Sequence, residues 1–266
     1  MKIVVCIKQV PDTAEVKLDP KTNTLIREGV PSIINHDDKA GLEAALRLRE
    51  QVGGTVTVVC MGPPQADVAL REALAMGADE GVLVSAREFG GSDTYATSQI
   101  LAAAINKIGV EKDDIVLCGR QAIDGDTAQV GPQIAEKLHL PQVTYAADIK
   151  KDGDTITVQR MLEDGYMTIK VQTPCLLTCI KELNNPRYMS IGGILSTYSK
   201  PLTTLGYEDL KDHPLIDATT IGLKGSPTNI FKSFTPPQKG AGMMLEGADK
   251  ATCEKLAGIL AAKHII

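Results

Sequence analysis

Short, continuously apolar runs alternate with stretches of helical periodicity in the first half of the chain. The helical stretches show apolar residues three or four positions apart, as in Val130, Ile134 and Leu138, which share one face of a helix. Apolar runs this short predict strands that are buried on both faces. Strands that alternate with helices predict right-handed βαβ units and a parallel sheet. The apolar runs are residues 2–8, 55–61, 81–84 and 114–118.

The pattern changes after Pro141. Residues 143–172 alternate polar and apolar positions with period two, interrupted by Asp152-Gly153 and Asp164-Gly165, which predicts antiparallel hairpins. A similar alternation at residues 16–27 predicts a small hairpin inserted after the first strand. Residues 174–180 are apolar again, which predicts that they rejoin the main sheet.

Proline and glycine accumulate from Lys181 onward, and helical spacing returns only at residues 248–263. Long irregular segments more often wrap a partner than stay ordered alone. The sequence therefore predicts an α/β, parallel-sheet domain over residues 1–183, with an antiparallel extension. We expect residues 184–266 to form a long C-terminal arm that wraps a partner, and the turns described next make the parallel-sheet domain a candidate nucleotide-binding domain.

The turn at residues 119–132 lies between a predicted strand and a predicted helix. In parallel α/β sheets, ligands bind at such turns, outside the carboxyl ends of the strands. Gly119 and Gly125 allow close backbone approach, and Asp126 or Thr127 could cap the helix. Free N–H groups and the helix dipole would then favour a phosphate. Asp124 and Asp126 would repel it, so we expect them at caps or at ribose hydroxyls. A purely structural turn explains the composition equally well.

Two more turns carry similar signals. Residues 35–39 place Asn and Asp before a helix, which predicts a cap or a second wall of a nucleotide site. Residues 89–94 place two glycines before Ser92 and Asp93, which predicts an anion cradle or a plain loop. The fingerprint GxGxxG is absent, so an ordinary NAD-type site after the first strand is not predicted.

Composition removes several classes of protein. The net charge is −5 and aromatic residues make up 3% with no Trp, so neither a nucleic-acid partner nor a stacking platform is indicated. We find no signal peptide and no apolar run of membrane length, and we expect a cytoplasmic protein. The six cysteines form no CxxC and the four histidines lack metal-ligand spacing, so we expect reduced core thiols and no metal.

Several motifs spread over the chain resemble the beta subunit of electron transfer flavoprotein. They are residues 5–10, residues 73–79, residues 119–126 with Gln129, and residues 184–188. The resemblance implies an adenine nucleotide wrapped by residues 119–130, with other residues lining the same pocket. The implied pocket is Cys6, Asn35, His36, Asp37, Asp38, Met61, Gly119, Arg120, Gln121, Ala122, Ile123, Asp124, Gly125, Asp126, Thr127, Ala128, Gln129 and Val130.

The resemblance also implies a heterodimer with an alpha subunit that carries an electron-transferring FAD. In some family members the beta subunit holds only AMP. In members that bifurcate electrons it holds a second FAD and takes hydride from NADH, and ferredoxin or flavodoxin is the low-potential acceptor. The small residues of the turn resemble the bifurcating pattern, because they leave room for a flavin; they are Gly125, Thr127, Ala128 and Val130. As a hypothesis, we assign part of an NADH pocket to Phe89, Gly90, Gly91, Asp93 and Thr94.

Residues 184–191 match the recognition loop of this family. In the family this loop anchors a partner acyl-CoA dehydrogenase through an apolar residue that aligns with Ile191, and the resemblance implies a partner of the butyryl-CoA dehydrogenase kind. Met189 departs from the smaller residue common in the family, which bears on partner specificity. The partner-binding residues implied are Asn184, Pro186, Arg187, Tyr188, Met189 and Ile191.

Two alternatives share this architecture. One is an AMP-binding, non-bifurcating beta subunit with a structural role. The other is a stand-alone ATP-using or nucleotide-sensing domain, which would need a P-loop or an equivalent cationic cradle. No P-loop motif is present in the sequence.

Overall fold

The computed structural model describes residues 1–12, 31–228, 231, 240 and 242–266. The chain divides into two compact units, Met1–Asn229 and Ile230–Ile266. The predicted hairpin at residues 16–27 lies outside the described residues. The chain on either side of it forms a short antiparallel pair, β2 (Gln9–Pro11) with β3 (Ser32–Ile34).

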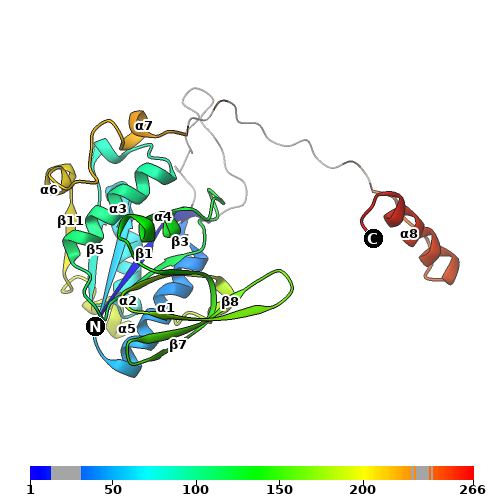
Figure 1. The fold of residues 1–266 in the computed structure, drawn as a ribbon, viewed down its shortest axis with the longest axis horizontal. Helices are drawn as coiled ribbons and strands as arrows, with labels where there is room; N and C mark the ends of the chain where they lie inside the picture. Colours follow the sequence, from blue (N-terminus) through cyan, green and yellow to red (C-terminus); the bar gives the residue numbers. More distant parts are fainter. Residues whose placement is uncertain (13–30, 229–230, 232–239, 241) are drawn as a thin grey trace. The chain divides into compact units, whose positions relative to one another are not determined.

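The described residues of the first unit build a nine-stranded sheet in the order β11-β5-β4-β1-β6-β10-β7-β8-β9 (Figure 1). The pairs from β11 to β7 are parallel, and β7, β8 and β9 pair antiparallel. The α/β class, the parallel sheet and the antiparallel extension are therefore as predicted. The strands are β1 (Lys2–Ile7), β4 (Thr55–Met61), β5 (Glu80–Val84), β6 (Ile115–Gly119), β7 (Gln142–Asp152), β8 (Thr155–Met161), β9 (Tyr166–Gln172), β10 (Cys175–Cys179) and β11 (Leu202–Leu205).

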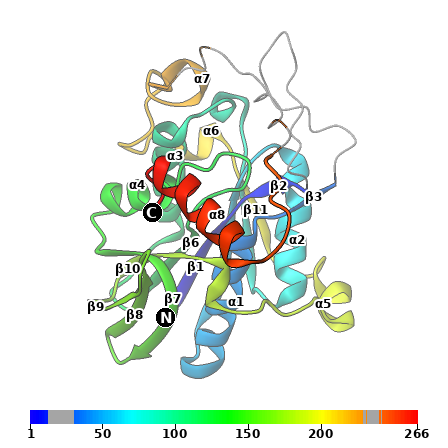
Figure 2. The ribbon, with the colours of Figure 1, turned by 90° about the vertical axis from the view of Figure 1, so that its right-hand side faces the viewer.

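Helices cover both faces of the parallel part of the sheet. Figure 2 shows α1 and α2 on one side of the strands and α3 and α4 on the other. Consecutive residues of β1 divide between the two cores: Ile3 and Val5 face α1 and α2, whereas Val4 and Cys6 face α3 and α4. This division explains why the strand is apolar at every position. The four helices are α1 (His36–Val52), α2 (Asp67–Met76), α3 (Thr94–Ile108) and α4 (Val130–Lys137).

Local signals account for most helix ends. Asp93 caps α3 by accepting a hydrogen bond of 3.0 Å from the N–H of Ala96, as its residue type favours. Gly77 ends α2 with a φ of 133°, a backbone conformation that glycine adopts readily. The cap predicted for Asp126 or Thr127 is wrong, because α4 begins later, with Gln129 at its N-cap position and no side-chain cap.

The segment after residue 183 contributes more to the first unit than its composition suggests. β11 adds a parallel edge strand next to β5, and the first unit extends to Asn229. The other short elements are η1 (Pro64–Ala66), η2 (Arg87–Phe89), η3 (Lys181–Leu183), α5 (Ile191–Ser196), α6 (Tyr207–Leu210) and α7 (Gly222–Gly225).

The second unit contains α8 (Lys250–Ala262), whose N-terminus is capped by Asp249. No residue of α8 is buried. None of the described helices combines the length and the apolarity needed to span a bilayer.

Candidate functional site

A cavity of about 890 Å³ opens at the carboxyl ends of β1, β4, β5 and β6. This is the position where parallel α/β sheets bind ligands, and the volume lies within the range of cofactor sites. Most of the predicted pocket residues line it. They are Cys6, Asp38, Met61, Phe89, Gly90, Gly91, Asp93, Thr94, Gly119, Arg120, Gln121, Ala122, Gly125, Thr127, Ala128, Gln129 and Val130.

The other predicted pocket residues lie beside the cavity without lining it. They are Asn35, His36, Asp37, Ile123, Asp124 and Asp126. Sequence reasoning also missed wall residues at the ends of strands and just after them, and their position at the end of an apolar run was the available signal. They are Ile7, Lys8, Gly62, Pro63, Pro64, Val84, Ser85, Ala86, Arg87 and Cys118. Thr97 and Leu101 of α3 and Gly131 of α4 also line the cavity, and so does Ser92 of the turn at residues 89–94.

The backbone of the turn before α4 offers free donors to the cavity. Ala128 has a φ of 53°, and Gln129 follows it in the right-handed region. Alternating left- and right-handed residues turn successive N–H groups toward one concave point, which is an anion-binding arrangement. The N–H groups of Thr127, Ala128 and Gln129 donate to no acceptor among the described residues. They are therefore available to a phosphate.

The two glycines of this turn have different roles. A Cβ on Gly119 would lie 2.0 Å from Oδ1 of Asp38, so this glycine allows the N-terminus of α1 to pack against the end of β6. A Cβ on Gly125 would meet no atom within 4 Å. Only Gly125 leaves open space beside its backbone for a ligand.

Asn35 supports the turn through its side chain. Its Nδ2 donates to the carbonyl of Gln121 over 2.8 Å, and its Oδ1 accepts from the N–H of Ile123 over 3.1 Å. No side-chain cap bond joins Asn35 to the first turn of α1. Asn35 thus holds the backbone of the turn in place from a position that does not line the cavity.

The acidic residues of the site are balanced by neighbouring cations and donors. Asp124 pairs with Nζ of Lys8 at 2.6 Å, and Asp126 accepts from Nε2 of Gln121. Asp37 lies 3.3 Å from Nε of Arg120. Burial raises the pKa of Asp37 above its ordinary value, while Arg120 opposes that rise. These pairings weaken the repulsion that the sequence led us to expect.

Asp38 lies on the cavity wall and is 6% exposed. Its Oδ2 accepts from the N–H of Lys8 over 2.7 Å. Burial raises the pKa of Asp38 to about 7, against the lowering effect of its hydrogen bonds. Its carboxyl therefore joins the ends of β1, α1 and β6 at one point.

The turn at residues 89–94 forms the opposite wall. Ser92 Oγ donates to the carbonyl of Phe89 over 2.8 Å, which closes the turn before α3. Thr94 Oγ1 donates to Oε1 of Gln129 over 2.8 Å. This bond links the wall after β5 with the turn before α4, so the two predicted glycine-containing turns lie on one cavity.

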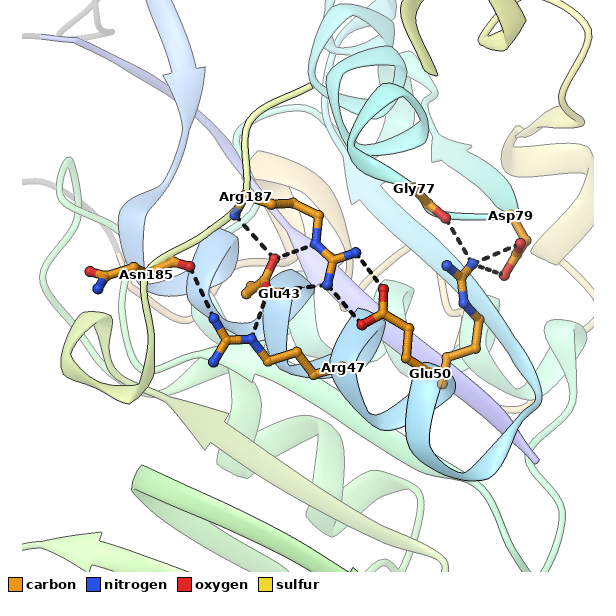
Figure 3. Close-up of polar contacts among 8 residues, drawn as sticks. Glu43, Arg47, Glu50, Gly77, Asp79, Asn185 and Arg187 are labelled. Carbon is orange, nitrogen blue, oxygen red and sulfur yellow. Dashed lines mark hydrogen bonds and ion pairs between the residues drawn. The ribbon is translucent and has the colours of Figure 1, made fainter. Parts of the chain in front are cut away.

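The predicted partner-binding residues lie away from the cavity, in and after the loop at residues 184–190. Asn184 Nδ2 donates to the carbonyl of Ala40 over 2.9 Å, and Arg187 contacts Glu43 and Glu50 of α1 (Figure 3). Tyr188 is 97% exposed and Ile191 80% exposed. The loop is thus fastened to α1 while its apolar side chains face outward.

All six cysteines are free thiols. The first five are buried, as expected for core thiols, and Cys253 is exposed. Among the described residues, no group of three or more His, Cys, Asp or Glu side chains is arranged to hold a metal ion.

A parallel sheet with a donor-lined cavity at its carboxyl edge defines an α/β protein whose cavity lies where this class binds its ligands. Comparison with known proteins narrows this class. The family model "Electron transfer flavoprotein domain" matches residues 22–210. The chain belongs to the electron transfer flavoprotein family and corresponds to its beta subunit.

The relatives match over the full length of both chains. The chain is 62% identical over 268 residues to the acryloyl-CoA reductase electron transfer subunit gamma of Anaerotignum propionicum. It is 57% identical over 271 residues to the caffeyl-CoA reductase-Etf complex subunit CarD of Acetobacterium woodii. It is 57% identical over 267 residues to the electron transfer flavoprotein subunit beta of Thermoanaerobacterium thermosaccharolyticum.

Proposed function

We propose that this beta subunit binds FAD in the cavity and accepts hydride from NADH, as part of an electron-bifurcating heterodimer with an alpha subunit. The observation that carries the proposal is the cavity itself. It combines free backbone N–H groups at residues 127–129 with a volume of about 890 Å³. An adenylate alone would leave much of this volume to solvent.

The walls near the free N–H groups are small enough for a bulky ring system. Ala122, Gly125 and Ala128 line the cavity, and Gly125 has open space where a side chain would project. The free N–H groups of Thr127, Ala128 and Gln129 would hold the diphosphate. Two aspartates that we predicted in the nucleotide site differ in position. Asp38 lines the cavity, whereas Asp124 does not line it and forms an ion pair with Lys8.

FAD held at residues 127–129 would supply the redox chemistry, which is two-electron oxidation of NADH and one-electron transfer to the FAD of the alpha subunit and to ferredoxin or flavodoxin. The side chains of this chain bind and orient the cofactors. We assign the nicotinamide nucleotide to the wall formed by residues 89–94. Its link to Gln129 through Thr94 keeps the two nucleotide sites at a fixed separation.

We assign a partner protein to each of two segments with exposed side chains, which are residues 184–191 and α8. The relatives named as subunits of acryloyl-CoA reductase and caffeyl-CoA reductase-Etf complexes support an acyl-CoA dehydrogenase or reductase as the partner at residues 184–191. We assign the arm after the first unit, including α8, to packing on the alpha subunit. A helix of 13 residues without a buried side chain is marginal alone in water.

The test is whether the purified heterodimer couples the reduction of ferredoxin to the reduction of an enoyl-CoA. With NADH, ferredoxin and an acyl-CoA dehydrogenase plus its enoyl-CoA substrate, ferredoxin should be reduced only while the enoyl-CoA is also being reduced. Ferredoxin reduction that proceeds without the enoyl-CoA, or no NADH oxidation at all, would contradict the proposal.

The second candidate function is an AMP-binding, non-bifurcating beta subunit. The same free N–H groups would bind the single phosphate of AMP, so they favour neither candidate. The number of flavins in the heterodimer separates the two.

A further inference from the structure

Glu43 lies in the middle of α1, and its carboxylate receives hydrogen bonds from two arginines. Its side chain is 3% exposed. Arg47 Nε donates to Oε1 over 2.7 Å, and Arg187 Nε donates to Oε2 over 2.8 Å. The backbone N–H of Arg187 adds a third donor at 3.1 Å. One buried carboxylate thus fixes both the backbone and the side chain of Arg187.

The charge state of Glu43 suits this role. Burial acts to raise the pKa of Glu43, but the hydrogen bonds from Arg187 and Arg47 outweigh burial and hold the pKa below its ordinary value. The carboxylate is therefore ionised at neutral pH. Charge-assisted bonds of this kind are stronger than neutral ones.

The two arginines also bond to groups other than Glu43 (Figure 3). Nη1 of Arg187 donates to Oε1 of Glu50 over 2.5 Å. Nη2 of Arg47 donates to the carbonyl of Asn185 over 3.3 Å. The loop is therefore attached to α1 at residues 185 and 187 by arginines that converge on Glu43.

The residues next to this attachment are apolar and exposed. Tyr188 is 97% exposed, Met189 45% and Ile191 80%. Exposed aromatic and aliphatic side chains that follow one another are typical anchors of protein interfaces. The direction of Tyr188 and Met189 depends on the backbone at Arg187, which Glu43 holds.

The far end of the exposed segment is attached independently, on α2. A Cβ on Gly193 would lie 2.1 Å from the carbonyl oxygen of Ala75, so α5 packs directly on the end of α2. Thr197 Oγ1 donates to the carbonyl of Arg71 over 3.1 Å. Loss of Glu43 should therefore loosen residues 185–189 and leave residues 193–200 in place.

We propose that Glu43 is a positioning residue for partner docking, which holds Tyr188, relative to Ile191 on α5, in the arrangement that a partner acyl-CoA dehydrogenase recognises. The inference rests on the proposed function, because it takes residues 184–191 as the docking surface. Prior ordering of a contact segment lowers the entropic cost of binding. Glu43 does not line the cavity, so among the functional readouts its effect is confined to docking.

The experiment uses the heterodimer coexpressed with its alpha subunit, and a butyryl-CoA dehydrogenase as the electron-accepting protein. For Glu43→Gln we expect the KM for the dehydrogenase to rise at least about tenfold. The kcat at saturating dehydrogenase and the NADH-dependent reduction of a small dye should each stay within about twofold of wild type. Hydrogen exchange should accelerate at residues 185–189 and stay unchanged at residues 193–200.

Glu72→Gln is the matched control. This variant removes a carboxylate of α2 that pairs with Lys39 of α1 at 2.6 Å. It should leave the KM for the dehydrogenase unchanged. Arg187→Gln is the second variant, in case Glu43→Gln fails to fold, and it should reproduce the rise in KM. An unchanged KM in folded variants, or equal losses of dehydrogenase and dye activity, overturns the inference. A wild-type heterodimer that delivers no electrons to the dehydrogenase overturns the proposed function, and the docking role with it.

Discussion

A Cβ placed on Gly119 would lie 2.0 Å from Oδ1 of Asp38 and 2.8 Å from the backbone N of Asp38. The end of β6 and the N-terminus of α1 are in direct contact at this point, on the wall of the cavity. The backbone of α1 cannot move away without breaking the bond between Asp38 and the N–H of Lys8. Glycine at position 119 is therefore a packing requirement of the fold.

Gly119→Ala should lower the free energy of unfolding by about 3 kcal/mol, the upper part of the range for overpacking, because rigid backbone atoms would have to shift. Gly125→Ala is the matched control. It faces open space, so we expect a change within about 0.5 kcal/mol. Urea denaturation of both variants checks this prediction, and equal stabilities of the two variants would contradict it.

Asp38 should give the protein a distinctive pH dependence. Its folded-state pKa of about 7 lies above the value of 3.8 expected in the unfolded chain. Between these values the folded protein keeps a proton that the unfolded chain has lost, so this group lowers stability as pH rises. Over the whole interval the effect is on the order of 4 kcal/mol.

Asp38→Asn removes this dependence, since the amide does not titrate. The unfolding free energy of wild type minus that of Asp38→Asn should therefore decrease steadily between about pH 4 and pH 7. Chemical denaturation across this range measures the difference directly. A difference that is constant or rises with pH would show that the carboxyl is not buried in the way described.

The Glu43 cluster should be visible in stability as well as in docking. Glu43→Gln removes a buried carboxylate, but the Arg187 and Arg47 side chains left behind are 32% and 50% exposed, so we expect a loss of about 2 kcal/mol. Glu50→Gln should cost less than about 1 kcal/mol, because the side chain of Glu50 is 50% exposed. A double-mutant cycle of Glu43 and Arg187 should show a coupling energy above about 1 kcal/mol, and additive effects would contradict the direct contact.

Ala128 should be sensitive to branching at Cβ. Its φ of 53° is rare for a β-branched residue, so valine would force the turn out of shape. We expect Ala128→Val to weaken adenine-nucleotide binding at least about tenfold, equivalent to about 1.4 kcal/mol. Ala128→Gly retains the backbone conformation and should bind as wild type does, as measured by titration calorimetry of the nucleotide-free heterodimer with AMP and FAD. Equal affinities for the two variants would argue against the N–H cradle.

Gly90 tests the assignment of the nicotinamide nucleotide. A Cβ at this position would approach the carbonyl of Arg87 to 3.2 Å, so valine should be accommodated with a small shift of the η2 turn. Gly90→Val should raise the KM for NADH several-fold, which corresponds to about 1 kcal/mol of lost binding, while the bound flavin is retained. Unchanged NADH kinetics would show that the nicotinamide nucleotide binds elsewhere.

The sequence predicted the parallel sheet because buried strands leave a strong signal. The continuous apolarity of β1 and β6 and the glycine that ends α2 are local features, and these three predicted elements were found. β11 was missed, since its central residues Thr203 and Thr204 are exposed, and its short length and the proline that precedes it resemble a loop. The order of the strands, and which strand lies at the edge of the sheet, depend on contacts between residues far apart in the sequence. The periodicity of apolar residues carries no information about such contacts.

The site was predicted in part for the same reason. Glycine and Asx residues after strands marked the two turns that share the cavity. The caps assigned to Asp126 and Thr127 were wrong, because the left-handed residues at 126 and 128 delay α4 to Val130. Lys8 and Arg87 were missed as wall residues, since a cation after a strand is common on protein surfaces.

The nucleotide content of the purified heterodimer tests the central proposal most directly. Denaturation should release two FAD per heterodimer, measured by absorbance, with masses that match FAD alone. One FAD together with one AMP per heterodimer would contradict the proposal that this subunit accepts hydride from NADH, and would leave it an AMP-binding subunit.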